Sequence, residues 1–342
     1  MKAIVLHEHG GVEALRHETV PTPEPGSGEV VVRVRAAGVN HVDLDVRAGR
    51  SGMAGLFPHV PGVDAAGEVA EVGAGVDEWR VGDRVAPHFI LQCGDCSNCV
   101  VGRENICEAF DVLGATVWGT YAEYVKVGRQ HLVRIPDGLS DAEAVSAYVP
   151  FATAWEALME VGQLQAGETV LVNAAGSGVG SAGLQVAALA GARVIATAGS
   201  TEKLERAREA GADGTINYRE EPIGERVREL TDGRGVDCVL ECVGGEVLQQ
   251  SIDALAPSGR LVSVGAHAGE VVPLDMIALF RKHVSVHGCG RSTRAIGRRV
   301  LELAAEGKLR PVIQQRFPLA EAGVAHTLLE QRKVFGRLVL LP

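Results

Sequence analysis

Two stretches near the start of the chain alternate apolar and polar residues over a short length. They are EVVVRVRAA at residues 29–37 and GEVAEV at residues 67–72, with turn signals such as Pro25-Gly26 and Val81-Gly82-Asp83 around them. Successive side chains of a β-strand point to opposite faces, so this alternation predicts strands with one buried face. The first part of the chain is therefore expected to be mainly antiparallel β.

A different rhythm begins near Phe151. Four short apolar runs follow one another at residues 169–175, 192–198, 235–243 and 259–266. Between them lie stretches such as 181–190 and 202–210, where apolar residues recur every three or four positions, as in an amphipathic helix. Strands that alternate with helices predict a parallel sheet with helices on both faces. The expected fold class is α/β, with a β-rich part before the parallel sheet.

The pattern changes once more near the end of the chain. After about Gly290 a helix is predicted over RAIGRRVLELAAEG (294–307), followed by a strand-like GRLVLLP (336–342). We expect this tail to pack back onto the first domain. A chain of 342 residues is also longer than a single hydrophobic core usually supports, which favours two domains.

Composition excludes several classes of partner. The formal net charge is −10, whereas a nucleic-acid partner needs a concentrated basic face. No window approaches the roughly 18 apolar residues of a membrane span, and MKAIVLHEHGG at the N-terminus lacks a signal-peptide pattern. We therefore expect a cytoplasmic globular protein that acts on a small molecule, with neither a nucleic-acid nor a membrane partner.

Four of the seven cysteines lie within one short stretch. Cys93, Cys96, Cys99 and Cys107 have the close spacing that lets a tight turn present several thiolates to one ion. Four thiolates leave no open position for substrate, so the pattern predicts one structural Zn²⁺ per chain. An iron–sulfur cluster is a rival, although the last gap departs from the usual ferredoxin spacing. Four free cysteines are the remaining alternative.

A glycine-rich turn follows the apolar run at 169–175. It reads Gly176-Ser177-Gly178-Val179-Gly180 and leads into a predicted helix. A strand that turns tightly into a helix offers free backbone N–H groups and the positive end of the helix dipole to a pyrophosphate. Ser181 stands where G-x-G-x-x-G, counted from Gly176, has its last glycine. At the start of a βαβ series the turn predicts a dinucleotide site; a purely structural glycine turn is the alternative.

The end of the second predicted strand of this series bears on the choice of cofactor. Ala198-Gly199-Ser200 contains no carboxylate to bind the ribose hydroxyls of NAD. Lys203 follows within one helical turn, with Arg206 and Arg208 beyond it, and these supply positive charge where a 2′-phosphate would lie. NADPH is therefore favoured over NADH. The alternative is that these cations form a solvated helix face.

These residues resemble the medium-chain dehydrogenase/reductase superfamily over essentially the whole chain. The similarity runs through GEVVVRVRAAGVNHVDLDVRAG, VPGVDAAGEVAEVG, the four-cysteine loop, ATAW, NAAGSGVG and KVFGRLVL. The resemblance implies a GroES-like catalytic domain at 1–150 and 291–342, with the zinc loop at 92–108, and a Rossmann domain at 151–290. Cofactor and substrate would lie between them. The four cysteines match the structural-zinc lobe of the zinc alcohol dehydrogenases.

The resemblance does not extend to the residues that bind a catalytic zinc. Zinc alcohol dehydrogenases have a cysteine where this chain has Asn40, and a histidine–glutamate pair where it has Val63-Asp64. The region of the usual third ligand, 148–153, holds no cysteine, histidine or carboxylate. A different metal site made from His41, Asp43, His59 and Asp64 is an alternative. Without the usual ligands, Lewis-acid zinc chemistry at the substrate is not expected.

Asn40 makes the chain similar to the quinone oxidoreductase branch, which reduces quinones or activated alkenes with NADPH. Asp45 departs from that branch, which often has a tyrosine there. Asn40 is the first candidate to stabilise negative charge on the substrate oxygen, and Asp64 is a supporting candidate whose alternative is a structural hydrogen bond. The cofactor residues expected from the glycine-rich turn and the resemblance are Thr153, Gly176, Ser177, Gly178, Val179, Gly180, Gly199, Ser200, Lys203, Tyr218, Gly265 and Arg337.

Three functions are compatible with this sequence. The first is an NADPH-dependent quinone or enone reductase, and the second is an alcohol dehydrogenase or carbonyl reductase. The third is a dinucleotide-binding protein without turnover, as crystallin-like members of the superfamily imply. The resemblance also implies a homodimer, or a tetramer, in which the strand-like VSVHGCG (284–290) extends a sheet across two subunits.

Overall fold

A computed structural model describes residues 1–50 and 57–342. These residues form two units. The first contains residues 1–50, 57–149, 293–307 and 313–342, and the second contains residues 150–292 and 308–312. The sequence places 308–312 with the first domain, but Gln185 holds them to the second, because its side chain bonds both the backbone N–H and the carbonyl of Arg310.

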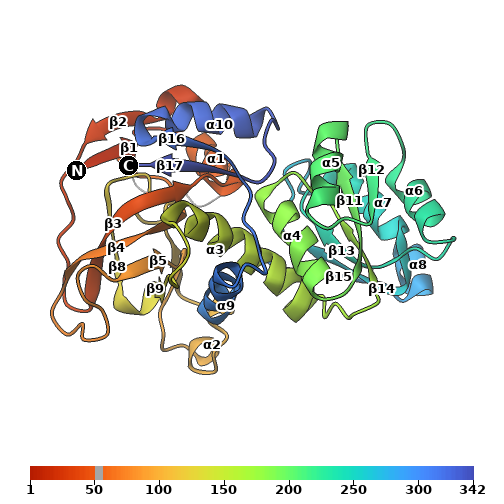
Figure 1. Cartoon of the computed structure of the whole chain (residues 1–342), viewed down its shortest axis with the longest axis horizontal. Helices are drawn as coiled ribbons and strands as arrows, with labels where there is room; N and C mark the ends of the chain where they lie inside the picture. Colours follow the sequence, from red (N-terminus) through yellow and green to blue (C-terminus); the bar gives the residue numbers. More distant parts are fainter. Residues whose placement is uncertain (51–56) are drawn as a thin grey trace. The chain divides into compact units, whose positions relative to one another are not determined.

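The first unit is built mainly from β-strands. Its central sheet has the order β16-β17-β3-β4-β5-β9, with β8 also paired to β3 (Figure 1). The tail strand β17 lies antiparallel to β3, which confirms that the end of the chain packs onto the first domain. The strands are β1 (Lys2–Val5), β2 (Arg16–Thr19), β3 (Glu29–Gly38), β4 (Asp64–Val72), β5 (Arg84–Pro87), β6 (Ile90–Gln92), β7 (Phe110–Val112), β8 (Tyr124–Gly128), β9 (Leu132–Arg134), β16 (Ile313–Pro318) and β17 (Arg337–Leu341).

Short helices complete this unit. They are α1 (His41–Ala48), α2 (Ser97–Val100), α9 (Arg294–Ala305) and α10 (Ala322–Glu330), with 3₁₀ turns η1 (Val12–Ala14), η2 (Glu104–Ile106), η3 (Arg129–His131) and η5 (Leu319–Glu321). Helix α3 (Asp141–Trp155) runs across the boundary into the second unit. None of the helices in the described part of the chain has the length and apolar character needed to cross a bilayer.

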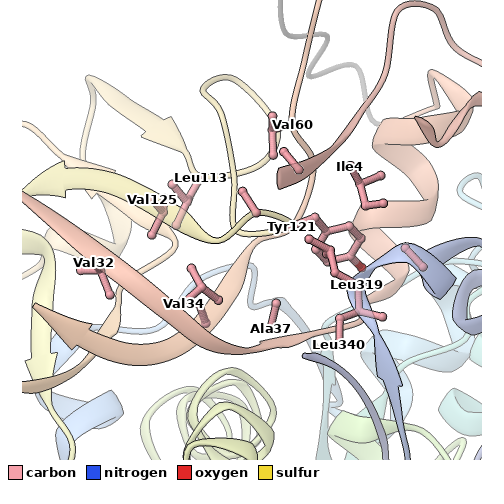
Figure 2. Close-up of a cluster of buried hydrophobic side chains, with 14 of the residues drawn as sticks. Ile4, Val32, Val34, Ala37, Val60, Leu113, Tyr121, Val125, Leu319 and Leu340 are labelled. Atoms are coloured by element: carbon pink, nitrogen blue, oxygen red, sulfur yellow. The ribbon is translucent and has the colours of Figure 1, made fainter. Parts of the chain in front are cut away.

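The core of the first unit gathers around Tyr121. Figure 2 shows its ring among Ile4, Leu319 and Leu340, while valines of β3 and β8 occupy another part of the same cluster. Gly62 leaves room for the ring, since a Cβ there would lie 2.4 Å from Cδ1 of Tyr121, and its φ of 102° is a conformation that other residues rarely adopt. The core thus fixes a large aromatic side chain that carries a polar hydroxyl.

The second unit contains one parallel sheet in the order β12-β11-β10-β13-β14-β15. This is the order of a Rossmann fold, with the chain reversing direction across the sheet between β10 and β13. The strands are β10 (Thr169–Val172), β11 (Arg193–Ala198), β12 (Gly214–Asn217), β13 (Val236–Glu241), β14 (Leu255–Ser263) and β15 (Ser285–Gly288). The helices are α4 (Gly178–Leu189), α5 (Thr201–Glu209), α6 (Ile223–Leu230), α7 (Gly245–Asp253) and α8 (Met276–Lys282), with a π-helical segment at Glu156–Val161. The predicted fold class is confirmed.

Candidate functional site

Asn40 lies at the point where β3 passes into α1, and its carboxamide is held from both ends. Its Oδ1 accepts a hydrogen bond of 2.7 Å from Nη1 of Arg337. Its Nδ2 donates over longer distances, 3.3 Å to Asp64 and 3.4 Å to the carbonyl of Gly38. Because Arg337 can only donate, the carbonyl end of the amide must face it, and the NH₂ end keeps the weaker contacts.

Asp64 and Arg337 form a buried ion pair beside that amide. Nη2 of Arg337 lies 2.7 Å from Oδ2 of Asp64, and both side chains are almost fully buried. Three neighbouring strands supply the residues: Gly38 ends β3, Asp64 begins β4 opposite it, and Arg337 begins β17. A Cβ on Gly38 would lie only 2.1 Å from Arg337 and 2.3 Å from Asp64. Gly38 is therefore a requirement of the site that sequence patterns did not reveal.

A second buried carboxylate, Asp43 of α1, stands next to this pair. It accepts hydrogen bonds from the backbone N–H groups of Asn40 and Val63 and from the hydroxyl of Tyr121. Burial raises the pKa of Asp43 to about 7, and the hydrogen bonds from Asn40 and Tyr121 oppose that rise. Burial also raises the pKa of Asp64, against the lowering effect of Arg337. The site thus concentrates two carboxylates and one permanent cation.

The four cysteines are brought together as predicted. Their Sγ atoms all lie within 4.8 Å of one another, and the pairs Cys93–Cys107, Cys96–Cys107 and Cys93–Cys99 are 3.4, 3.9 and 4.0 Å apart. Thiolates at about 2.3 Å from a tetrahedral zinc would be about 3.8 Å apart, so the geometry fits Zn²⁺. Backbone N–H groups lower the pKa of Cys96 to about 6, whereas burial raises that of Cys99 to about 12. A divalent cation would favour the thiolate form of all four.

The alternative metal site at His41, Asp43, His59 and Asp64 is not formed. Asp43 and Asp64 are engaged as described above, and Nε2 of His59 bonds the carbonyl of Gly114, where burial lowers the pKa of its ring. The cysteine cluster is the one group with metal-ligand geometry among residues 1–50 and 57–342. Asp43 and Asp64 consequently serve the hydrogen-bond network around Asn40.

The glycine-rich turn of the second unit has the form that a pyrophosphate requires. β10 ends at Val172, and Ala174 takes a left-handed backbone conformation with φ of 51°. Ser177 caps α4 by accepting a hydrogen bond from the N–H of Gly180, while Ser177, Gly178 and Val179 remain partly exposed. The helix starts at Gly178, so its first N–H groups point toward the turn.

Two glycines let α4 approach the sheet closely. A Cβ on Gly180 would lie 2.1 Å from the carbonyl oxygen of Ala174, and one on Gly183 would lie 2.4 Å from the side chain of Leu240 in β13. Counted from Gly178, the run Gly178-Val179-Gly180-Ser181-Ala182-Gly183 fits G-x-G-x-x-G without departure. Counting from Gly176 missed Gly183, although the spacing was available in the sequence.

The predicted adenosine-phosphate residues gather at the end of β11. Ser200 caps α5 by accepting a hydrogen bond from the N–H of Lys203. Two side chains of the next strand end lie near Gly199. A Cβ added to Gly199 would be 2.6 Å from Oη of Tyr218 and 3.0 Å from Nε of Arg219. Arg219 was not expected from sequence and adds a second cation to this group. Glu202 is exposed on α5, so no buried carboxylate occupies the end of β11.

A hydrogen-bonded set ties together the carboxyl ends of three strands in the same sheet. Asn173 bonds Thr197 at 3.0 Å and Ser251 at 2.7 Å, and the buried Glu241 accepts bonds from Asn173 and from the N–H of Gly244. Gly265 lies against the backbone of the β13 end, since an added Cβ would be 3.1 Å from the carbonyl of Cys242. These residues stiffen the edge where a dinucleotide binds in this fold. Thr153 lies on α3 and is partly exposed.

Two family models match the chain. The model described as "Alcohol dehydrogenase GroES-like domain" covers residues 26–137, and the model described as "Zinc-binding dehydrogenase" covers residues 178–306. The first match lies in the β-rich unit, and the second begins within the glycine-rich turn, at Gly178, and contains most of the parallel sheet.

Similar proteins align with the chain from end to end. A quinone oxidoreductase of Pseudomonas aeruginosa is 35% identical, covering 100% of this chain and 99% of the relative. An NAD-dependent alcohol dehydrogenase of Sulfolobus acidocaldarius is also 35% identical and covers 99% of both chains. A solved structure of an NAD-dependent alcohol dehydrogenase is 41% identical, with a TM-score of 0.96 and complete coverage of both chains.

Proposed function

The chain belongs to the medium-chain dehydrogenase/reductase superfamily, and we propose that it is an NADPH-dependent reductase that transfers hydride to a quinone or an activated alkene without a catalytic zinc. It is an NAD(P)H-dependent oxidoreductase by membership of that family. The observation that carries the finer proposal is the Asn40–Asp64–Arg337 cluster. Asn40 and Asp64 occupy positions where the resemblance places metal ligands of the zinc alcohol dehydrogenases, and both side chains bond Arg337.

The chemistry of this cluster disfavours a cation as its occupant. One oxygen of Asp64 accepts from Arg337 and the other from Asn40, so its lone pairs already point at donors. The Arg337 guanidinium would also repel a divalent ion held at Asp64. The donor set therefore supports a site that binds an electron-rich oxygen rather than a metal.

Asn40 can stabilise the charge that the reduction creates. When bound, the dihydronicotinamide supplies a hydride to an electron-poor carbon of the substrate, and negative charge develops on the conjugated oxygen. The long contacts of Nδ2 to Asp64 and Gly38 leave its N–H groups able to donate to such an oxygen, which is a stronger acceptor. Arg337 keeps the amide in that orientation and neutralises Asp64. Water supplies the proton that completes the reduction.

The choice of NADPH rests on the group at the end of β11. Ser200, Lys203, Tyr218 and Arg219 offer two hydroxyl donors and two cations to a 2′-phosphate, and the acidic residue that binds the ribose in NAD-selective sites is missing from this position. The named NAD dependence of two similar proteins makes NADH the competing cofactor. The cofactor preference is therefore tested directly by comparing the two dinucleotides.

The first test combines metal content with turnover. Protein purified without added metal should contain about one zinc per chain, and should oxidise NADPH in the presence of quinones or enones. About two zinc ions per chain, together with alcohol-dependent reduction of the cofactor, would establish an alcohol dehydrogenase instead. Cofactor binding without turnover on quinones, enones and aldehydes would contradict both reactions.

Asn40→Ala tests the role assigned to the amide. Loss of one donor to a developing oxyanion lowers kcat by roughly 100-fold in comparable sites. The dissociation constant of NADPH, measured by fluorescence, should change by less than about two-fold, since the amide is assigned to the substrate oxygen. An unchanged kcat would remove Asn40 from the mechanism.

A further inference from the structure

A chain of buried hydrogen bonds reaches Asp43 from the surface of the first unit. It begins at the half-exposed Glu330 of α10, which pairs with Arg47 of α1. Nη1 of Arg47 lies 3.1 Å from Nδ1 of His326, and Nε2 of His326 lies 3.2 Å from Oη of Tyr121. The hydroxyl of Tyr121 is 3.0 Å from Oδ2 of Asp43. Arg47, His326, Tyr121 and Asp43 are all at most 2% exposed.

Chemistry fixes the direction of every bond in this chain. Arg47 can only donate, so Nδ1 of His326 must accept. The neutral ring then carries its proton on Nε2 and donates to Tyr121, which donates in turn to Asp43. Burial and the charge of Arg47 lower the pKa of His326 to about 3, and burial raises that of Tyr121 well above its ordinary value. His326 and Tyr121 therefore keep their protons unchanged near neutral pH.

The chain is unsuited to carrying a proton inward. Its outer end is a guanidinium, which does not lose its proton in proteins, so a proton entering from Glu330 cannot pass Arg47. The ring of Tyr121 is immobilised in the core by Ile4, Leu319 and Leu340 (Figure 2). A rigid chain with a permanent cation at one end holds its last member in place.

Asp43 in turn holds the two segments that carry the site. Its Oδ2 accepts from the backbone N–H of Asn40 at 2.8 Å, and its Oδ1 accepts from the N–H of Val63 at 3.1 Å. Val63 directly precedes Asp64. One carboxylate therefore ties the start of α1 to the start of β4, the two places from which Asn40 and Asp64 project.

We propose that Asp43 is the positioning residue for Asn40 and Asp64, and that Tyr121, His326 and Arg47 orient its carboxylate through a one-way hydrogen-bond chain. The consequence for catalysis rests on the role proposed for Asn40, whereas the positioning itself does not. Both parts can be measured separately because the side-chain amide of Asn40 gives its own nuclear magnetic resonance signal.

The test compares two substitutions that each remove one buried tyrosine hydroxyl. Tyr121→Phe breaks the chain, and Tyr148→Phe is the matched control. Tyr148 is also buried and also pairs with a histidine, with Oη 3.0 Å from Nδ1 of His88 and the rings edge to face, but it lies outside the chain to Asp43. We expect the ¹H–¹⁵N signal of the Asn40 side chain, assigned from its loss in Asn40→Ser, to shift in Tyr121→Phe and stay in place in Tyr148→Phe.

Activity supplies the second readout. Tyr121→Phe should lower kcat for the quinone or enone at least about ten-fold, leave the dissociation constant of NADPH within about two-fold, and keep a native melting transition. Tyr148→Phe should keep kcat within about two-fold. A shifted Asn40 signal without quinone or enone turnover in the wild type would support the positioning and contradict the proposed function. An unshifted signal with unchanged kcat would overturn the positioning role.

A measurement on the unaltered protein guards against a variant that fails to fold. The ¹⁵N shifts of the His326 ring should show a neutral ring protonated on Nε2 between pH 6 and 8. A ring protonated on Nδ1, or on both nitrogens, would overturn the direction of the chain. Asp43→Asn places an NH₂ group against donors and should displace the Asn40 signal further than Tyr121→Phe does.

Discussion

At the scale of single residues, Arg337 determines what the site can bind. Its guanidinium donates to Asn40 and Asp64 at once, and it reaches them because Gly38 has no side chain. A buried ion pair of this kind contributes little net stability, whereas removing one partner commonly costs about 3–5 kcal/mol. In this chain the ion pair fixes the orientation of the Asn40 amide, and the charge of Arg337 neutralises that of Asp64.

The cations near β11 give the clearest prediction on the cofactor. Replacing Lys203 and Arg219 together by alanine should raise KM for NADPH by at least roughly 100-fold, because two charge-assisted hydrogen bonds of about 1.5–3 kcal/mol each would be lost. KM for NADH should stay within about two-fold. Arg208→Ala is the control, since its guanidinium on the same helix bonds Thr215. A wild-type protein with the lower KM for NADH would contradict the assignment.

His326 should make the stability of the protein depend on pH. Its pKa is about 3 in the folded chain and 6.5 as its ordinary value, so between these limits the unfolded chain binds the extra proton. The wild type therefore loses stability as the pH falls through this window, by at most about 1.4 kcal/mol per unit, compared with His326→Gln. Urea unfolding at pH 5, 6, 7 and 8 measures this difference, which should be constant above pH 7.

The exposed His17 provides the control for that experiment. His17→Gln, on β2, should reproduce the wild-type dependence on pH. If His326→Gln does the same, the buried ring is not held neutral by the fold, and the hydrogen-bond chain described above loses its direction.

At the scale of elements, the cysteine loop is expected to depend on its metal. α2 and η2 are only one turn each and join the four thiols within residues 93–107, so the loop has little packing of its own. Cys96→Ser should lower the zinc content from about one per chain to near zero and lower the thermal midpoint. Cys289→Ser, at a buried position outside the loop, should keep the zinc. Iron with visible absorption in the wild type would contradict a zinc site.

Elements with a local pattern could be predicted from the sequence. The alternation at 29–37 and 67–72 gave β3 and β4, and the apolar runs of the second half gave β10, β11, β13 and β14. Their ends were less accurate. β10 stops three residues before Ala175, because Ala174 turns into a left-handed conformation, and α4 begins three residues before Ser181, because Ser177 caps it inside the glycine turn.

The network around Asn40 could not be predicted from any local pattern. Tyr121 and Asp43 are 78 residues apart, Tyr121 and His326 are 205 apart, and Arg47 and His326 are 279 apart. They meet through contacts between segments far apart in the chain, such as the backbone hydrogen bonds that join Tyr121 to Ile4 and to Pro61. Asn40 and Asp64 stand out in the sequence because they depart from the metal ligands of the zinc alcohol dehydrogenases that the chain resembles, whereas for Asp43 the sequence suggests only a role as a metal ligand.

At the scale of the whole molecule, the second unit has an incomplete edge. β15 is the last strand of its sheet, and its residues are mostly exposed. The segment that precedes β15 in the chain carries exposed apolar side chains, and with Val286 of β15 itself we call these residues the α8 patch: Val271, Leu274, Met276, Ile277, Phe280 and Val286. An unprotected edge strand next to apolar surface favours association with another chain. We propose a second copy as that partner, with two β15 strands paired across a two-fold axis.

The proposed dimer predicts a mass in solution of twice the chain's 35.9 kDa. Phe280 and Val286 are 60% and 39% exposed, so charging them should cost the monomer little. The double variant Phe280→Lys with Val286→Lys would bury two cations of each subunit opposite two of its partner, which is strongly unfavourable. Light scattering should therefore show a monomer. Val324→Lys, at an exposed apolar position on α10, should remain dimeric. A monomeric wild type would contradict the interface, and a double variant that stays dimeric would place it elsewhere on the surface.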